Sequence, residues 1–234
     1  MPFRAAAVVC AELAHARLFF VMGTMKITAL KIQARNKSRV NVYVDGKYGF
    51  AVAKIVAARL KVGQELDENA IAGLRDVDDV EKAYERALKF LAPRPRSVVE
   101  VRRRLETAKV TAPTIEEVLQ RLQRAGLLDD QAFANFWVEN RGTFRPRSKR
   151  ALRMEMKQKG LPEEAVKQAL AETDDGGAAV ALAAQRAPRL ASLEYQDFRR
   201  KLGEFLARRG FNYDTIQPVV EQAWKDLHPG TSGD

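Results

Sequence analysis

Two stretches of this chain, RPRSVVEVRRRL at residues 94–105 and RPRSKRALRMEM at residues 145–156, follow one pattern. Each contains a Pro that ends the preceding helix, then a Ser of the kind that caps a helix N-terminus, then apolar residues at helical spacing. The apolar residues Leu105 and Met156 are 51 positions apart, and Leu206 follows 50 positions later. This regular spacing predicts an internal repeat, the feature that decides the fold class.

The sequence around each stretch predicts a unit of three helices. A longer helix precedes the Pro-containing segment, and a further helix follows a short break. We therefore expect a mainly α-helical protein built from tandem three-helix repeats over 78–128, 129–175 and 176–228. Repeats stacked in this way form an elongated, curved molecule suited to long partners. A helical bundle whose helices resemble one another by chance is the alternative interpretation.

Residues 26–77 are expected to form a small region that contains a β-hairpin. Val residues at positions 40, 42 and 44 alternate with polar or aromatic residues and are followed by Asp45-Gly46. Asp and Gly tolerate the positive φ of a two-residue hairpin turn. An earlier strand is expected over 27–33.

The turn also predicts which residues face each other across the hairpin. Tyr43 should face Tyr48 and Asn41 should face Phe50, which would give one aromatic face and one Val-rich face. A helix over 52–60 should cover the sheet, because so small a sheet is not stable alone. A second, short helix should then be capped by Asp67 and end at Leu74.

The first residues fit neither pattern. Arg4 and the apolar run after it imitate a short signal peptide, but charged residues interrupt the run. Met25 opens the regular sequence, so we interpret residues 1–25 as a leader of doubtful status. The single cysteine, Cys10, allows no intrachain disulfide, and no apolar stretch is long enough to span a membrane. We expect a cytoplasmic protein.

The chain is basic, and its positive charge is concentrated in the middle. It has 40 Lys and Arg against 30 Asp and Glu, a formal net charge of +10. Residues 94–160 hold 16 basic and 8 acidic side chains, whereas residues 161–234 hold 9 and 12. A basic band of this kind favours a polyanionic partner, either nucleic acid or an acidic protein or membrane surface.

Residues that would support catalysis are scarce. The two histidines, His15 and His228, lie in the leader and in what reads as a polar tail, so neither a His-based triad nor a His/Cys zinc site is expected. No phosphate-binding loop occurs. Pairs of acidic residues at 129–130, 163–164 and 174–175 stand at helix starts, where they complement the helix dipole. We expect no enzyme activity, no cofactor and no metal.

The candidate binding residues are the basic side chains of the two quoted stretches and of the helices that they open. Arg150, Arg153 and Lys157 fall on one helix face, and such a row can follow phosphates or contact carboxylates of a protein partner. An ordinary solvated helix face is the alternative. The predicted residues are Arg94, Arg96, Arg102, Arg103, Arg104, Arg145, Arg147, Lys149, Arg150, Arg153, Lys157 and Lys159.

Several of these segments resemble the RecX family of recombinase regulators. The resemblance covers about residues 26–225 and is most specific in the middle of the chain. Repeat one departs from the family pattern in having Ala108-Lys109 where a Gly is expected. The segments that carry the resemblance are Ala87-Leu88-x-x-Leu91, Arg96-Ser97-x-x-Glu100-Val101-x-x-x-Leu105, Gly126-Leu127-Leu128-Asp129-Asp130-x-x-Phe133-Ala134, Lys159-Gly160-Leu161 with Ala169-Leu170, and Val62-Gly63-x-Glu65-Leu66.

The resemblance implies a function without catalytic residues. Family members lie in the groove of the RecA–DNA filament and inhibit the ATPase, strand-exchange and coprotease activities of RecA. We therefore expect a monomeric negative regulator of homologous recombination that binds the RecA filament and, weakly and non-specifically, single-stranded DNA. A DNA-binding transcription regulator that uses the basic helices and the N-terminal hairpin is the alternative.

Overall fold

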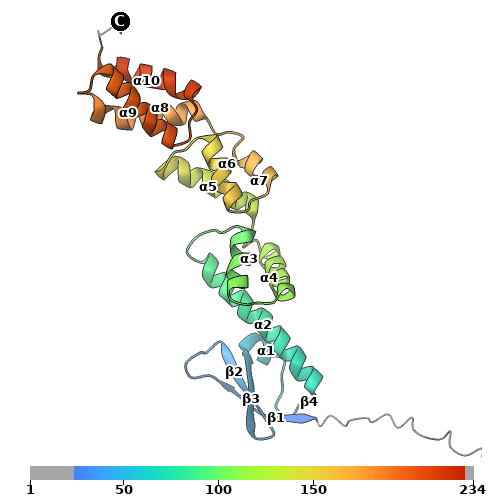
Figure 1. Cartoon of the computed structure of the whole chain (residues 1–234). Coiled ribbons are helices and arrows are strands. Elements are labelled where there is room, and N and C mark those ends of the chain that lie inside the picture. Colours follow the sequence, from blue (N-terminus) through green and yellow to red (C-terminus); the bar gives the residue numbers. More distant parts are fainter. Residues whose placement is uncertain (1–23, 230–234) are drawn as a thin grey trace, which may run out of the picture. The chain divides into compact units, whose positions relative to one another are not determined.

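The computed structural model describes residues 24–229, and the chain divides into two compact units, one up to Asp79 and one from Val80 onward (Figure 1). The predicted leader, with Cys10, lies outside the described residues except for its last two positions. The helices dominate, and the strands are confined to the first unit, as the sequence predicts.

The first unit contains an antiparallel sheet with the strand order β3-β2-β1-β4. One face of this sheet is the core, because the alternating Val side chains and Phe50 are buried there with residues of the following helices. The strands are β1 (Met25–Ile32), β2 (Arg39–Val44), β3 (Lys47–Ala53) and β4 (Glu65–Leu66).

A β-bulge changes the predicted register of the hairpin. Tyr43 faces Tyr48 as expected, but Val42 rather than Asn41 faces Phe50. The extra residue is Gly49, where an added Cβ would lie 2.2 Å from Val44 Cγ2. A bulge moves every later side chain to the other face of its strand. Phe50 therefore lies in the core and not on the aromatic face.

The helices of the first unit also differ from expectation. The predicted helix over 52–60 is reduced to α1 (Lys54–Ala57), because residues 52 and 53 extend β3. Asp67 accepts a hydrogen bond from Ala70 N–H as a cap, but the helix does not end at Leu74. It continues as α2 (Glu68–Leu91), because no Pro interrupts it and a single Gly is tolerated inside a helix.

The buried Asp78 on α2 ties the end of the sheet to this helix. Its side chain is 2% exposed and accepts hydrogen bonds from Ala53 N–H at 2.7 Å and from Arg39 at 2.9 and 3.2 Å. The carboxylate is thus both paired and hydrogen-bonded, the condition under which a charge is tolerated in a core.

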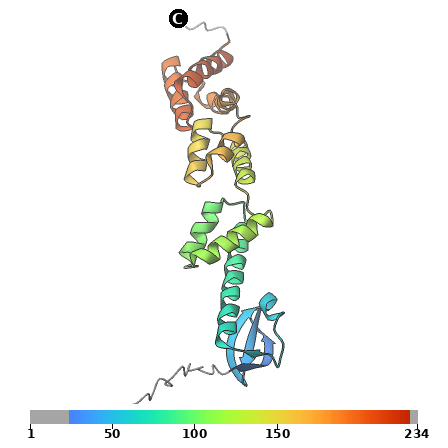
Figure 2. The same cartoon turned by 90° about the vertical axis from the view of Figure 1, so that its right-hand side faces the viewer.

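The second unit contains the three repeats, and in each of them three helices pack around an apolar core (Figure 2). The C-terminal half of α2 is the first helix of repeat one. The other helices are α3 (Val98–Thr107), α4 (Ala112–Arg124), α5 (Asp130–Phe144), α6 (Lys149–Gln158), α7 (Glu163–Ala169), α8 (Asp175–Arg186), α9 (Tyr195–Arg208) and α10 (Tyr213–Leu227), with the short 3₁₀ helix η1 (Ala187–Leu190) between α8 and α9.

Local sequence explains the helix starts. Ser97 and Ser148 cap α3 and α6 as predicted, and Ser97 forms a full capping box with Glu100. Of the acidic pair at 129–130, Asp129 caps α5. His228 does not lie in a polar tail, because its ring stacks on Trp224 with the ring centroids 3.8 Å apart.

Candidate binding surface

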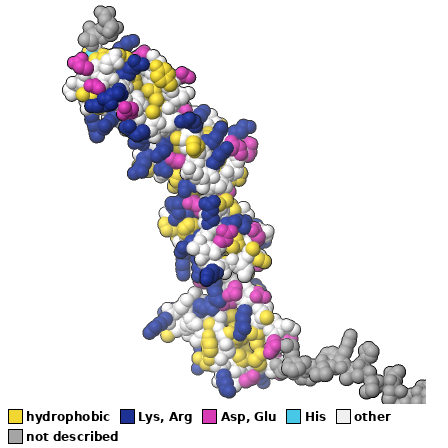
Figure 3. Space-filling model, in the orientation of Figure 1, with side chains coloured by type: hydrophobic (Ala, Val, Ile, Leu, Met, Phe, Trp, Pro, Cys, Tyr) yellow, Lys and Arg dark blue, Asp and Glu magenta, His cyan; other side chains and the backbone are white. Residues whose placement is uncertain are grey.

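The second helix of repeats one and two turns its basic side chains outward because its apolar stripe faces the core. Val101 and Leu105 of α3 are 0% exposed, and Leu152 and Met156 of α6 are at most 2% exposed. Figure 3 shows Lys and Arg side chains over the repeats, with acidic side chains beside many of them.

Seven of the twelve predicted residues form ion pairs inside the chain. Their partners are four glutamates, which the sequence analysis did not assign to them. The pairs are Arg94, Arg96 and Lys159 with Glu100, Arg102 with Glu116, Arg147 with Glu155, and Arg153 and Lys157 with Glu163. These seven cations contribute less free charge to a partner than their number suggests.

Glu100 is the centre of a charged cluster that joins repeats one and two. Its carboxylate lies 3.0 Å from Arg94 and 3.2 Å from Lys159, which is 59 residues further along the chain. Burial alone would raise the pKa of Glu100, but hydrogen bonds from Arg94, Ser97 N–H and Lys159 outweigh that effect and lower the pKa. The carboxylate therefore stays charged and holds the two repeats together.

A second cluster surrounds Trp137 on α5. Its indole N–H donates to Glu155 at 2.9 Å, and Arg141 donates to the same carboxylate at 2.7 Å. The Lys159 ammonium lies 4.6 Å from the Trp137 ring centroid, within cation–π range. Arg147 completes the cluster as an ion pair, Nε to Oε1 3.0 Å, without hydrogen-bond geometry. Lys159 and Arg147 thus stabilise contacts within the protein itself.

The same serine hydrogen bond occurs at both junctions between repeats. Ser97 Oγ donates to the carbonyl of Lys159 at 2.7 Å, and Ser148 Oγ donates to the carbonyl of Gly210 at 2.6 Å. Both bonds span 62 residues. Each serine therefore caps its own helix and also binds the end of the second helix in the next repeat.

A carboxylate completes each junction. Asp130 accepts from Val98 N–H at 2.9 Å, and Asp175 accepts from Lys149 N–H at 2.7 Å. Both acids belong to the pairs expected at helix starts, and within these pairs the preceding residues, Asp129 and Asp174, cap α5 and α8. We call the Ser and Asp bonds together the junction latch.

The glycines after α6 and α9 are required by the latch. Gly160 and Gly210 have φ of +75° and +96°, and a Cβ on Gly160 would lie 2.6–2.9 Å from three atoms of Val99. In repeat one the same position is Lys109, with φ of +59° and an exposed side chain. The departure from Gly is tolerated there because no preceding repeat packs against Lys109.

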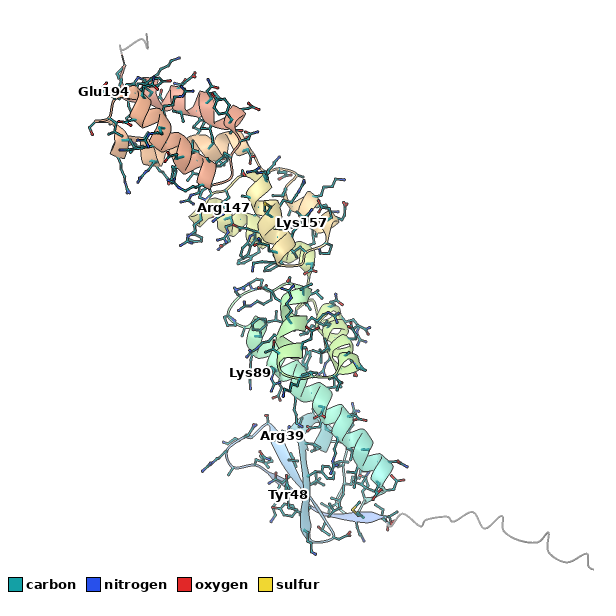
Figure 4. The ribbon with its side chains drawn as sticks, viewed as in Figure 1. Arg39, Tyr48, Lys89, Arg147, Lys157 and Glu194 are labelled. Carbon is teal, nitrogen blue, oxygen red and sulfur yellow. The ribbon has the colours of Figure 1, made fainter. Side chains whose placement is uncertain are left out.

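Five of the predicted residues remain available to a partner, in that they form no ion pair within the described part of the chain. Arg103, Arg104, Arg145 and Arg150 are exposed, and Lys149 is half-buried. Two apolar side chains lie close to them in sequence and are exposed, Phe144 at 74% and Met154 at 59%. The basic positions of α6 flank Met154, and Figure 4 labels Arg147 before this helix and Lys157 near its end.

The exposed Phe144 and Met154 were not predicted. Met154 lies two residues from both Leu152 and Met156 and is therefore outside the apolar stripe of α6, which is the signal by which the sequence could have identified it. Phe144 lies at helical spacing from Phe133 and Trp137, so its spacing gave no such signal.

Within residues 24–229, no cluster of acidic, His or Cys side chains could hold a metal ion, and no helix is long and apolar enough to cross a membrane.

Comparisons with known proteins find matches in the N-terminal region and in each of the three repeats. The family models that match are the regulatory protein RecX N-terminal domain at residues 25–67 and the first, second and third three-helix domains of RecX at residues 83–122, 129–170 and 174–220.

Curated relatives and solved structures agree with these matches. The regulatory protein RecX of Bacillus licheniformis is 32% identical over 84% of this chain and 76% of its own length. The regulatory protein RecX of Levilactobacillus brevis is 34% identical, with coverage of 87% and 77%. A crystal structure of regulatory protein RecX, 28% identical, matches 84% of this chain and 99% of that chain with a TM-score of 0.69. These matches to all four domains and over most of the length of the relatives show that the chain belongs to the RecX family of regulatory proteins.

Proposed function

We propose that this protein binds the RecA–DNA filament as a monomer in the cytoplasm and inhibits the ATPase, strand-exchange and coprotease activities of RecA. Membership of a family of regulatory proteins supports a regulatory role. The proposal involves no catalytic step and no cofactor.

The single structural observation that carries the proposal is the set of basic side chains on α3 and α6 that form no ion pair within residues 24–229. Arg103, Arg104 and Arg150 are exposed. A guanidinium group without an internal carboxylate can bind a phosphate or a carboxylate of a partner in bidentate fashion. A filament of protein on DNA presents both groups.

Binding to bare DNA should be weak, independent of sequence and sensitive to salt, because no element between residues 24 and 229 is an evident reader of base edges. If n basic residues meet phosphates, log K should fall with log salt with a slope of about −0.7n on single strands. Tight binding to one duplex sequence that changes little with salt would instead support the transcription regulator.

The test is the ATPase rate of RecA on single-stranded DNA, measured while the protein is titrated in. We expect the triple variant Arg103→Gln, Arg104→Gln and Arg150→Gln to need at least about tenfold more protein for half inhibition, since each lost charge-assisted hydrogen bond costs roughly 1.5–3 kcal/mol.

A matched control removes the same charge elsewhere. Arg124, Lys167 and Lys225 are exposed, lie outside the second helices and form no ion pair among residues 24–229. Their triple Gln variant should inhibit like the parent protein. Equal loss in both variants would show that only net charge matters, and a parent protein that does not inhibit would refute the proposed function itself.

A further inference from the structure

The open face of the sheet in the first unit, which the function above does not use, combines aromatic and basic side chains. Residues 24–67 contain nine Lys and Arg but only three Asp and Glu. Arg39 is bound to Asp78, and the other eight form no ion pair among the described residues. This surplus is denser than in the rest of the chain and makes the segment 24–67 complementary to a polyanion.

Two tyrosines stand on the face of the sheet that is turned away from the core. Tyr43 and Tyr48 face each other across β2 and β3 with ring centroids 6.2 Å apart and the ring planes at 83°. Tyr48 is 58% exposed, and Figure 4 labels it on this sheet. The Lys31 ammonium lies 5.1 Å from the Tyr43 ring centroid.

Tyr48 is exposed and Tyr43 is half-buried, and small residues flank both of them. Ala29 is the partner of Tyr43 on β1, and Gly49, the residue of the bulge, follows Tyr48. Neither has a side chain large enough to cover a ring.

We propose that this face binds single-stranded nucleic acid, whose unpaired bases stack on Tyr43 and Tyr48 while a phosphate meets Lys31. Aromatic side chains on an open antiparallel sheet, flanked by cations, bind single strands because every base has a π-face and every nucleotide a phosphate. A duplex does not fit this chemistry, since its bases are already stacked.

The tyrosine pair also has a purely structural interpretation, because aromatic cross-strand pairs stabilise hairpins. The two interpretations predict different effects of tyrosine variants on the affinity for single strands and for duplex. Replacing both tyrosines by Thr keeps a residue that favours strands but removes the rings. Replacing both by Phe keeps the rings and removes the hydroxyl groups.

The experiment measures fluorescence anisotropy of labelled oligo(dT), oligo(U) and a mixed-sequence duplex with the full-length chain, in the absence of RecA. Stacking on an aromatic side chain is worth roughly a 5- to 150-fold change in affinity per base. The pair Tyr43→Thr and Tyr48→Thr should therefore weaken binding of the single strand about tenfold or more, and leave duplex binding nearly unchanged. Oligo(dT) and oligo(U) distinguish a DNA from an RNA ligand.

Two further variants separate the contributions of ring and charge. The pair Tyr43→Phe and Tyr48→Phe should bind the single strand like the parent. The single variant Lys31→Gln should reduce the salt slope on single strands by about 0.7, which corresponds to one phosphate contact.

The proposal is overturned if the Thr pair, with a melting curve like that of the parent, binds oligo(dT) and oligo(U) with unchanged affinity. It is also overturned if the Thr pair loses duplex and single-strand affinity equally, or if the Phe pair loses as much as the Thr pair. None of these measurements depends on inhibition of RecA, so failure here leaves the proposed function untouched.

Discussion

Gly160 offers a direct measure of how much the contact between repeats contributes to stability. Gly160→Ala adds a Cβ that would lie 2.6, 2.7 and 2.9 Å from three atoms of Val99, far inside the usual contact distance of about 3.5–4.0 Å between carbons. The side chain of Val99 belongs to the neighbouring repeat. The close contact is therefore relieved only if the two repeats move apart.

Gly126→Ala is the matched control. Gly126 has a similar φ of +67°, but an added Cβ there meets nothing within 4 Å. Both variants force a residue with a Cβ into the left-handed region, at about 1–2 kcal/mol each. Only Gly160→Ala adds overpacking, which costs about 1–3 kcal/mol more.

The assay is urea unfolding followed by circular dichroism, with the free energy of unfolding extrapolated for the parent and both variants. We expect Gly160→Ala to lose about 2–5 kcal/mol and Gly126→Ala to lose about 1–2 kcal/mol. Equal losses in the two variants would refute the reasoning, because they would show that the close contact with Val99 does not add to the backbone strain.

Three further outcomes are expected. Lys109→Gly should raise the free energy of unfolding by up to about 1 kcal/mol in the same urea assay, because it removes left-handed strain at an exposed position; a loss would contradict this account. Glu100→Gln should destabilise the protein at neutral pH, and since the folded-state pKa of Glu100 is lowered, the difference from the parent should shrink as pH falls through that pKa, as pH-dependent unfolding would show. Leu152→Ala should cost roughly 2–5 kcal/mol, because Leu152 is 2% exposed in the core of repeat two; a melting temperature like that of the parent would argue against the assigned core.

The three repeats could be predicted from the sequence because helix caps and apolar stripes are local patterns. Ser97 and Ser148 stand directly before their helices, and the apolar stripe of α6 is visible within ten residues. The spacing of 51 and 50 residues between equivalent positions then fixed the order of the units. The same locality explains the correct pairing of Tyr43 with Tyr48 next to the turn.

The hairpin register and the ion pairs were not predicted correctly, because they depend on contacts that no local sequence pattern contains. The bulge at Gly49 depends on the approach of Val44 across the hairpin, so the register beyond it could not be read from alternation. The ion pair of Lys159 with Glu100 spans 59 residues and exists only because two repeats meet. Arg147 and Glu155, by contrast, are only eight residues apart, and their pairing could have been considered.

The junction latch has a consequence for solubility. A head-to-tail contact that repeats within one chain could also join one molecule to the next and produce an open-ended polymer. Here neither end of the array is complementary to the other. At the first repeat Lys109 stands in the glycine position, and at the last repeat the spacing places Phe198, which is 0% exposed, where Ser97 and Ser148 stand. The helix α9 begins earlier, after Glu194, which makes no capping hydrogen bond (Figure 4). Neither terminal repeat therefore offers the residues of the junction latch to another molecule. End-to-end stacking of separate molecules into an insoluble polymer is not favoured.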